Sequence, residues 1–221
     1  MADQAAERRA TVWDLPTRLF HWMLVLLIGA AWATREQLDD SERHALVGYA
    51  ILALLLFRLL WGVVGSETAR FSSFLRGPAK VWAYLRGSGG VSAAPGHNPL
   101  GGYSVAALLT LIGIQAVTGL FLYDDEMFLG PLNGWVSEDT AELLADLHEL
   151  NFNLLLGVIA LHVGAILFYA VARRRNLLGP MLSGRAPLPD GAAPPRIAST
   201  ALAFLLLVIA AAAVWALVTY A

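Results

Sequence analysis

Hydrophobic residues in this chain gather in five long runs that are separated by polar connections. The runs cover residues 16–34, 44–65, 102–123, 148–172 and 198–219. A helix needs about 20 mainly apolar residues to cross the hydrocarbon core of a bilayer. The pattern therefore predicts five membrane-spanning helices, the first of which is too long for the apolar region of a cleaved signal peptide.

Composition supports a multi-pass membrane protein and narrows its chemistry. Hydrophobic residues make up 57% of the chain and charged residues 14%, against about 25% charged residues in soluble domains. The chain has no cysteine, which excludes disulfides, cysteine-bound zinc, iron–sulfur clusters and covalently attached c-type haem. We expect the lipid bilayer as a partner, and neither a soluble second domain nor a nucleic-acid partner.

Charge is distributed unevenly between the two sides of the predicted membrane protein. The first and third connections hold twelve acidic residues: Glu36, Asp39, Asp40, Glu42, Asp124, Asp125, Glu126, Glu138, Asp139, Glu142, Asp146 and Glu149. The N-terminal segment and the second and fourth connections hold twelve basic residues: Arg8, Arg9, Arg18, Arg70, Arg76, Lys80, Arg86, Arg173, Arg174, Arg175, Arg185 and Arg196. Because lysine and arginine favour the cytoplasmic side, we predict a cytoplasmic N-terminus and a periplasmic C-terminus.

Two connections carry further local signals. Asp139, followed by Glu142, has the character of a capping box and predicts a helix start ahead of the fourth apolar run. Residues 184–197 are rich in proline and glycine and lack apolar periodicity, which indicates an extended linker. We therefore divide the chain into a four-helix unit at 1–183, a linker at 184–197 and an additional transmembrane helix at 198–221.

Four of the five histidines lie in or at the ends of predicted spans, where ionisable residues are costly and mark functional sites. His148 and His162 are 14 residues apart, which on a helix is about 21 Å of rise and about 40° from a shared face. With the predicted topology, depth pairs His44 with His148 near the outer surface and His21 with His162 near the inner one. Two histidine pairs from facing helices suit two stacked b-type haems, whose iron would then have no open position and would carry electrons.

Two residues in the same predicted helix as His44 support the haem interpretation, although each has a structural alternative. Gly48 shares the face of His44 and would let a flat ring approach the backbone. Arg58 lies at about the depth of His162, where a haem propionate would offset its charge. The alternatives are interfacial or hydrogen-bonded histidines, a glycine that serves helix packing, and an Arg58 that reaches the membrane surface.

These residues resemble those of the bacterial cytochrome b561 and Ni,Fe-hydrogenase b-type cytochrome family. The resemblance covers residues 11 to about 183 and rests on "VWDLPTRLFHW", "HALVGY", "FRLLWG", "GHNPLGG", "QAVTGLFL" and the spaced histidine pair. It implies an all-α bundle of four transmembrane helices that holds two haems b, with His21, His44, His148 and His162 as axial ligands. The fifth helix is additional to this pattern.

The resemblance also implies a role in the bacterial inner membrane. Such proteins relay electrons between membrane quinone and a periplasmic partner, such as a hydrogenase, a dehydrogenase or a c-type cytochrome. Quinone often binds near the inner haem, which makes His97 and Asn98 candidates, although these residues could equally cap the third helix. Arg18 would hold a propionate or a lipid headgroup, and the small residues of the fifth helix suggest docking to another membrane protein.

Three hypotheses follow for the function. The first is an electron-transfer subunit of a quinone-linked oxidoreductase, with acidic outer loops that attract a basic c-type cytochrome or that simply follow from topology. The second is a superoxide:quinone oxidoreductase that acts at the outer face, where only Arg35 and Arg43 could attract the anion. The third is a membrane scaffold without redox chemistry.

Overall fold

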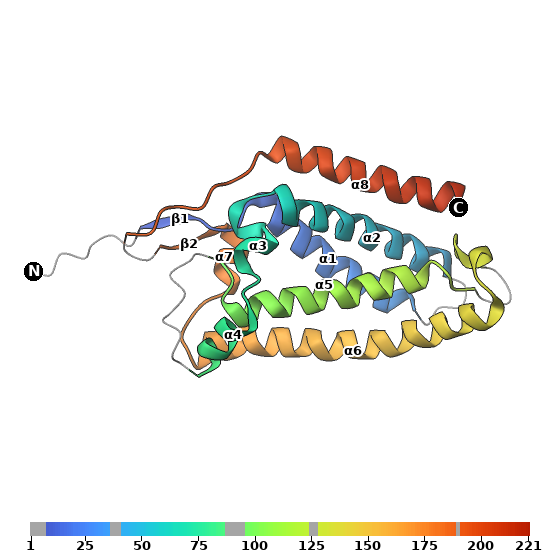
Figure 1. Cartoon of the computed structure of the whole chain (residues 1–221), viewed down its shortest axis with the longest axis horizontal. Helices are drawn as coiled ribbons and strands as arrows, with labels where there is room; N and C mark the ends of the chain where they lie inside the picture. Colours follow the sequence, from blue (N-terminus) through green and yellow to red (C-terminus); the bar gives the residue numbers. More distant parts are fainter. Residues whose placement is uncertain (1–7, 36–40, 87–95, 124–127, 189–190) are drawn as a thin grey trace, which may run out of the picture.

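The computed structural model is almost entirely helical (Figure 1) and describes residues 8–35, 41–86, 96–123, 128–188 and 191–221. Five long helices run side by side: α1 (Leu15–Thr34), α2 (Ser41–Val64), α5 (Pro99–Gly119), α6 (Glu138–Val171) and α8 (Thr200–Tyr220). All five are long and apolar enough to cross a membrane. The five spans predicted from the hydrophobic pattern are thus confirmed, and the chain is a multi-pass membrane protein.

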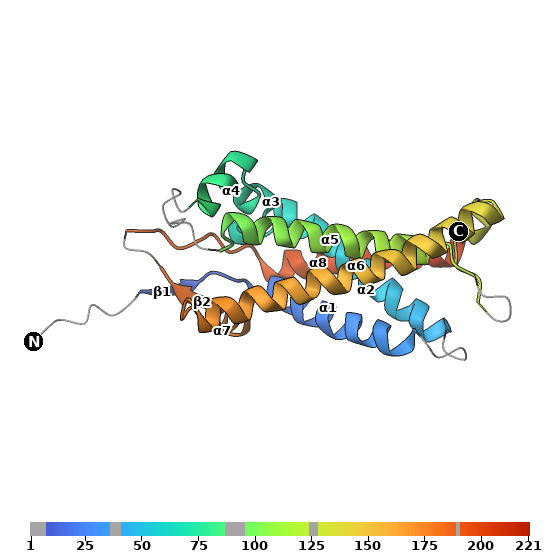
Figure 2. The same ribbon diagram turned by 90° about the horizontal axis from the view of Figure 1, so that it is seen from below.

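Helix α2 lies at the centre of the bundle. It packs against α1, α5 and α8, while α6 packs along α5 on the side away from α8 (Figures 1 and 2). The core that joins these helices includes Leu55 and the fully buried Trp61 of α2, Ile112 of α5 and the fully buried Ala210 of α8. The additional helix is therefore packed on the bundle through α2.

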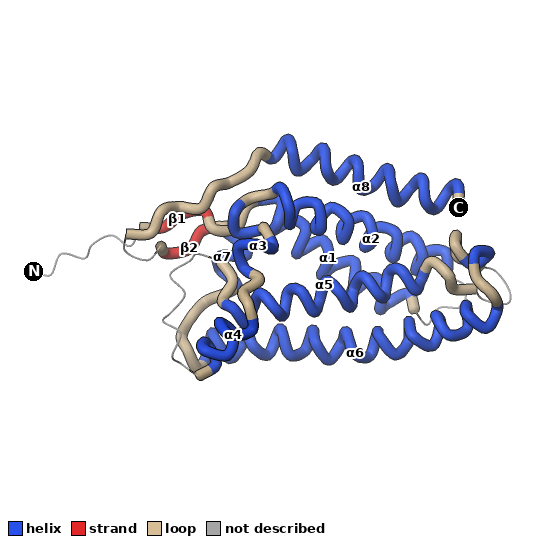
Figure 3. The backbone as a smooth tube through the Cα atoms, viewed as in Figure 1, coloured by secondary structure: helices blue, strands red, loops and turns tan. Residues whose placement is uncertain are grey.

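The two ends of the bundle differ in charge and in structure. The end that holds the starts of α1, α5 and α8 carries the arginine-rich connections and is called the basic end below; the opposite end is the acidic end. The basic end also holds the short elements β1 (Arg9–Thr11), η2 (Glu67–Ala69), α3 (Phe71–Phe74), α4 (Pro78–Leu85), α7 (Leu178–Ser183) and β2 (Arg185–Pro187) (Figure 3). The acidic end holds η3 (Asn133–Trp135).

The start of α6 differs from the prediction by two residues. Ser137 is the N-cap, and its side chain accepts a hydrogen bond from the backbone N–H of Thr140. Asp139, which was predicted to begin a capping box with Glu142, instead lies in the first turn next to Glu138. Both carboxylates then face the positive end of the helix dipole, where negative charge is stabilising. The expectation that this helix begins ahead of the apolar run is correct.

The ends of α5 and of the linker show what the hydrophobic pattern missed. Helix α5 ends at Gly119, before the predicted 123, because the chain turns and the backbone N–H of Gly130 donates back to the Leu122 carbonyl.

The stretch expected to be a linker holds a short strand, β2, which pairs with β1 as an antiparallel ladder. Further along, the Arg196 carbonyl accepts from the backbone N–H of Glu67 at 2.9 Å. The linker is therefore tied to the basic end.

Candidate metal centre

The predicted outer histidine pair comes together at the acidic end. His44 lies in the first turns of α2 and His148 in the first half of α6, and their ring centroids are 6.4 Å apart with ring planes inclined by 71°. Imidazole nitrogens lie about 2.0–2.1 Å from a bound metal, so two imidazoles on opposite sides of one ion place their centroids about 6 Å apart. The observed spacing fits one metal ion between the two rings.

The surroundings of this pair favour an iron macrocycle over a bare ion. Among the residues that the structure describes, no three histidine, cysteine or carboxylate side chains gather in a group that could hold a metal ion. Two imidazoles suffice only when the remaining ligands come from the metal's own cofactor, as in haem.

Two glycines lie next to the acidic-end histidines. A Cβ atom added at Gly48, the residue predicted to share the face of His44, would meet no atom within 4 Å, so this position opens onto free space. A Cβ atom at Gly119 would lie only 3.3 Å from Cε1 of His148. Sequence reasoning missed Gly119, although it stands in the quoted "QAVTGLFL" stretch. Both glycines keep the vicinity of the histidines clear for a flat ring.

The second predicted pair, His21 of α1 and His162 of α6, lies toward the basic end. The two side chains are close enough to interact electrostatically. Nδ1 of His21 is buried and makes no hydrogen bond, and the ring meets Trp22 edge-on with centroids 4.9 Å apart. The helix packing thus brings the members of both predicted pairs near each other.

Arg58 is a buried cation beside the basic-end pair. Only 3% of Arg58 is exposed, and its guanidinium lies 4.9 Å from the centre of the Phe71 ring. Asp14 attracts it electrostatically, but both oxygens of Asp14 already accept other hydrogen bonds, from Thr17 N–H and from Trp61 Nε1. A buried charge needs a partner, so the site suits an additional carboxylate.

Arg18 precedes His21 by one turn of α1 and points toward α7. Its Nη1 donates to the carbonyl oxygen of Leu182, whereas its Nε is buried and makes no hydrogen bond. Arg18 is therefore only partly satisfied by the protein and keeps donor capacity near the basic-end pair.

His97 is enclosed by aromatic rings at the same end. Its ring centroid lies 4.6 Å from that of Trp13 and 4.8 Å from that of Phe74. Burial lowers the pKa of His97 to about 4, with smaller electrostatic contributions from the neighbouring Arg58 and His162. The imidazole is therefore neutral at pH 7 and can donate or accept one hydrogen bond at each nitrogen.

Asn98 has a structural role in α5. It is the N-cap, and its Oδ1 accepts from the backbone N–H of Gly101 at 2.6 Å. Its Nδ2 lies 3.4 Å from the hydroxyl of Tyr169, which in turn is 2.8 Å from the hydroxyl of Tyr84. The sequence left two roles open for Asn98, a quinone ligand or a helix cap, and the structure contains the helix cap.

Unsatisfied polar atoms gather where these cations lie. Within the described part of the chain, every buried side-chain nitrogen or oxygen that lacks a hydrogen bond belongs to the basic end: Thr17 Oγ1, Arg18 Nε, His21 Nδ1, Arg58 Nη1 and His97 Nδ1. Buried polar groups are normally hydrogen-bonded. Their clustering fits an acidic cofactor with carboxylates, such as the propionates of haem.

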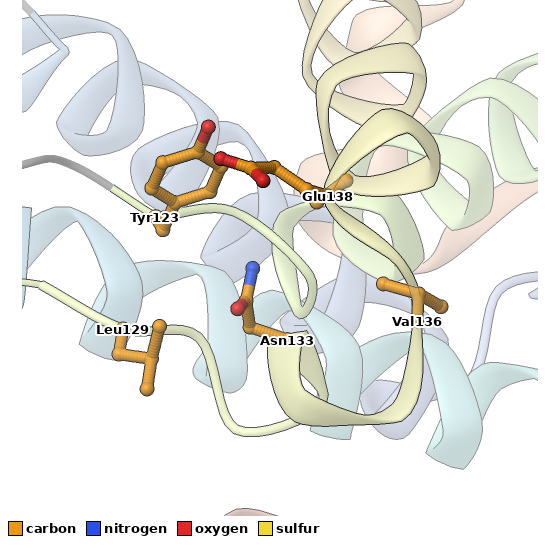
Figure 4. A pocket seen from close by; sticks show the side chains of 6 residues that line it. Tyr123, Leu129, Asn133, Val136 and Glu138 are labelled. Atoms are coloured by element: carbon orange, nitrogen blue, oxygen red, sulfur yellow. The ribbon is translucent and has the colours of Figure 1, made fainter.

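A separate pocket of about 260 Å³ opens at the acidic end (Figure 4). It is lined by Tyr123, Leu129, Asn133, Val136, Glu138 and Ala141, which come from the turn after α5 and from the start of α6. Asn133 supports the turn by donating from Nδ2 to the Phe121 carbonyl at 2.7 Å. The sequence does not predict this pocket, since the residues that form it lack a regular pattern.

Fold and site together define a class: a multi-pass membrane protein whose helices bring two pairs of histidines near each other and bury cations at the basic end. The family model of prokaryotic cytochrome b561 matches residues 12–184, which is most of the chain, and the chain belongs to this family. No curated protein and no solved structure matches it. Family membership confirms the resemblance seen in the sequence and makes the chain a membrane b-type cytochrome that binds b-type haem and transfers electrons.

Proposed function

We propose that this protein holds two haems b, each between two histidines, and transfers electrons across the membrane between quinone and a redox protein. His44 and His148 would ligate the acidic-end haem, and His21 and His162 the basic-end haem. The observation that carries the proposal is the 6.4 Å separation of the His44 and His148 ring centroids. A haem held by these histidines would supply one-electron chemistry to the protein.

The chain's own residues would hold and orient the two groups. At the basic end, Arg58 and Arg18 offer unsatisfied donors for propionate carboxylates, and a bidentate arginine–carboxylate pair is the strongest such contact. At the acidic end, Gly48 leaves open space beside His44. The two ends thus provide different environments for two chemically identical groups.

Quinone exchange is assigned to the basic end, near His97 and Asn98. Neutral His97, with a buried Nδ1 that makes no hydrogen bond, can serve as a donor or an acceptor for a quinone oxygen. Asn98 would contribute through its position at the start of α5, because its Oδ1 is occupied by the helix cap.

The outer partner would meet the acidic end. All six described acidic residues of these connections are exposed: Glu42, Glu138, Asp139, Glu142, Asp146 and Glu149. The other six, Glu36, Asp39, Asp40, Asp124, Asp125 and Glu126, lie outside the described residues. Such a surface attracts a basic partner, such as a basic c-type cytochrome. With the basic end on the cytoplasmic side of the inner membrane, this partner is periplasmic.

Superoxide oxidation at the acidic end is the alternative function, and the site favours it less. Only Arg35 and Arg43 could attract the anion there, and the guanidinium of Arg35 lies 5.2 Å from the centre of the Phe152 ring. We therefore expect that superoxide supplied to the purified protein will reduce its haem at a rate no higher than the rate of spontaneous superoxide dismutation.

The test is the haem content of the purified full-length protein, measured in detergent as the reduced pyridine haemochrome, with a redox titration on the same sample. The proposal predicts two haems b per chain that titrate at separate potentials. One haem per chain would contradict the pairing of four histidines. Protein that binds no haem would favour the membrane-scaffold hypothesis instead.

A further inference from the structure

Each acidic-end histidine is held by a threonine on a neighbouring helix. Nδ1 of His44 lies 3.2 Å from Oγ1 of Thr34, in the last turn of α1. Nδ1 of His148 lies 3.0 Å from Oγ1 of Thr118, in the last turn of α5. Two helices that differ in sequence thus present the same hydroxyl to the same ring nitrogen.

The direction of these hydrogen bonds follows from the other contacts of the hydroxyls. A threonine hydroxyl has one proton, and each of these protons is donated within its own helix. Thr34 Oγ1 lies 3.0 Å from the Ala30 carbonyl, and Thr118 Oγ1 lies 2.8 Å from the Ile114 carbonyl. The hydroxyl oxygens therefore accept from the imidazoles, and the imidazole proton resides on Nδ1.

A backbone carbonyl reinforces each bond. The Ala31 carbonyl lies 3.1 Å from Nδ1 of His44, and the Gln115 carbonyl accepts a hydrogen bond from His148. Each carbonyl belongs to the residue three positions before the threonine. Since a carbonyl can only accept, the Ala31 contact independently fixes the proton of His44 on Nδ1 and leaves the lone pair of its Nε2 to bind a metal.

His21 of the basic-end pair differs in this respect. Nδ1 of His21 is buried and has no hydrogen-bond partner. A hydrogen bond from Nδ1–H to an acceptor raises the basicity of the other ring nitrogen and fixes the orientation of the ring. A more basic ligand stabilises ferric iron over ferrous iron and so lowers the reduction potential.

We propose that Thr34 and Thr118 are positioning residues that hold His44 and His148 as metal ligands and lower the reduction potential of the acidic-end haem. The inference rests on the proposed function, in that it takes these two histidines as ligands. The two threonines make the two haems unequal and so direct the electron from one to the other.

The experiment compares Thr34→Val and Thr118→Val, singly and together, with Thr34→Ser and Thr118→Ser as matched controls that keep the hydroxyl. Full-length protein in detergent is titrated potentiometrically, and electron paramagnetic resonance of the ferric form reports the ligand geometry. We expect valine to shift the acidic-end haem several-fold toward the reduced form at a fixed potential. The shift is larger in the double variant, while the basic-end haem and both serine variants titrate as the original protein does.

The outcomes separate this inference from the proposed function. If the original protein holds two haems and the valine variants titrate unchanged, the role of the threonines is wrong and the proposed function stands. If the original protein lacks two histidine-ligated haems, both are wrong. Loss of the acidic-end haem in the valine variants supports the inference when the serine variants keep it, and overturns it when they lose it too.

Discussion

The carboxylate of Asp14 accepts a hydrogen bond from the indole nitrogen of Trp61, with 3.1 Å between Oδ2 and Nε1. Both residues are almost fully buried, and Trp61 has no exposed surface. The other carboxylate oxygen of Asp14 accepts from the backbone N–H of Thr17 at 2.6 Å and so caps α1. One side chain therefore begins the first helix and fixes it to the end of α2, beside Arg58.

Replacing Asp14 is expected to destabilise the basic end of the bundle. Asp14→Ala removes a helix cap, worth about 1 kcal/mol, and leaves a buried indole N–H unpaired, at about 1–3 kcal/mol. Asp14→Asn keeps only one of the two acceptor oxygens, so it should restore only part of the loss. Thermal unfolding in detergent measures both effects, and Ser137→Ala, which removes an exposed cap from α6 alone, is the control. Equal stability of Asp14→Ala and Ser137→Ala would contradict the linking role of Asp14.

Each single histidine substitution should remove one haem, and the two histidines of a pair should remove the same haem. His44→Ala and His148→Ala are each expected to lose the acidic-end haem, and His21→Ala and His162→Ala the basic-end haem, because an iron with one axial imidazole is held weakly. Haem content should fall from two per chain to one, with matching difference spectra within a pair and different spectra between pairs. Identical spectra for His44→Ala and His21→Ala would show that the pairing is wrong. His97→Gln is the control and should retain both haems.

Arg58 should raise the potential of the basic-end haem, since a nearby positive charge favours the more reduced, less positive iron. Arg58→Gln removes that charge and is expected to lower this potential by roughly 40–80 mV, as an interaction of about 1–2 kcal/mol implies for one electron. Arg58→Lys keeps the charge and should recover most of the shift. Redox titration measures the potential of each haem. A shift of the acidic-end haem alone would contradict the assignment of Arg58 to the basic-end haem.

The fold was largely predictable because the membrane imposes a simple hydrophobic pattern on each span. The strands were not, because Arg9–Thr11 pair with Arg185–Pro187, and no local periodicity connects segments so far apart. The pairing of His44 with His148 was predictable, because the fixed rise per residue of a helix gives each histidine a definite depth in the membrane. That the hydroxyl of Thr118 contacts His148 was not predictable, because this contact depends on how α5 is rotated against α6, which a single sequence does not encode locally.

The acidic end should make electron transfer to a basic partner depend on salt. Opposite charges speed the encounter at low ionic strength and lose their effect as ions screen them. We expect the rate of electron transfer to a small basic c-type cytochrome to fall about tenfold when the ionic strength is raised from a low value to physiological values and above. A triple variant, Glu138→Gln, Asp139→Asn and Glu142→Gln, should be slower at low salt and show a shallower dependence.

The matched control neutralises the other end, with Arg173, Arg174 and Arg175 each changed to glutamine. If the cytochrome binds the acidic end, this variant keeps the rate and the salt dependence of the original protein. If the acidic loops only follow from membrane topology, the two triple variants behave alike, because neither surface then guides the partner. A salt dependence that is lost only in the arginine variant would mean that the redox protein meets the opposite end of the bundle, so that the assignment of the outer haem to His44 and His148 is reversed.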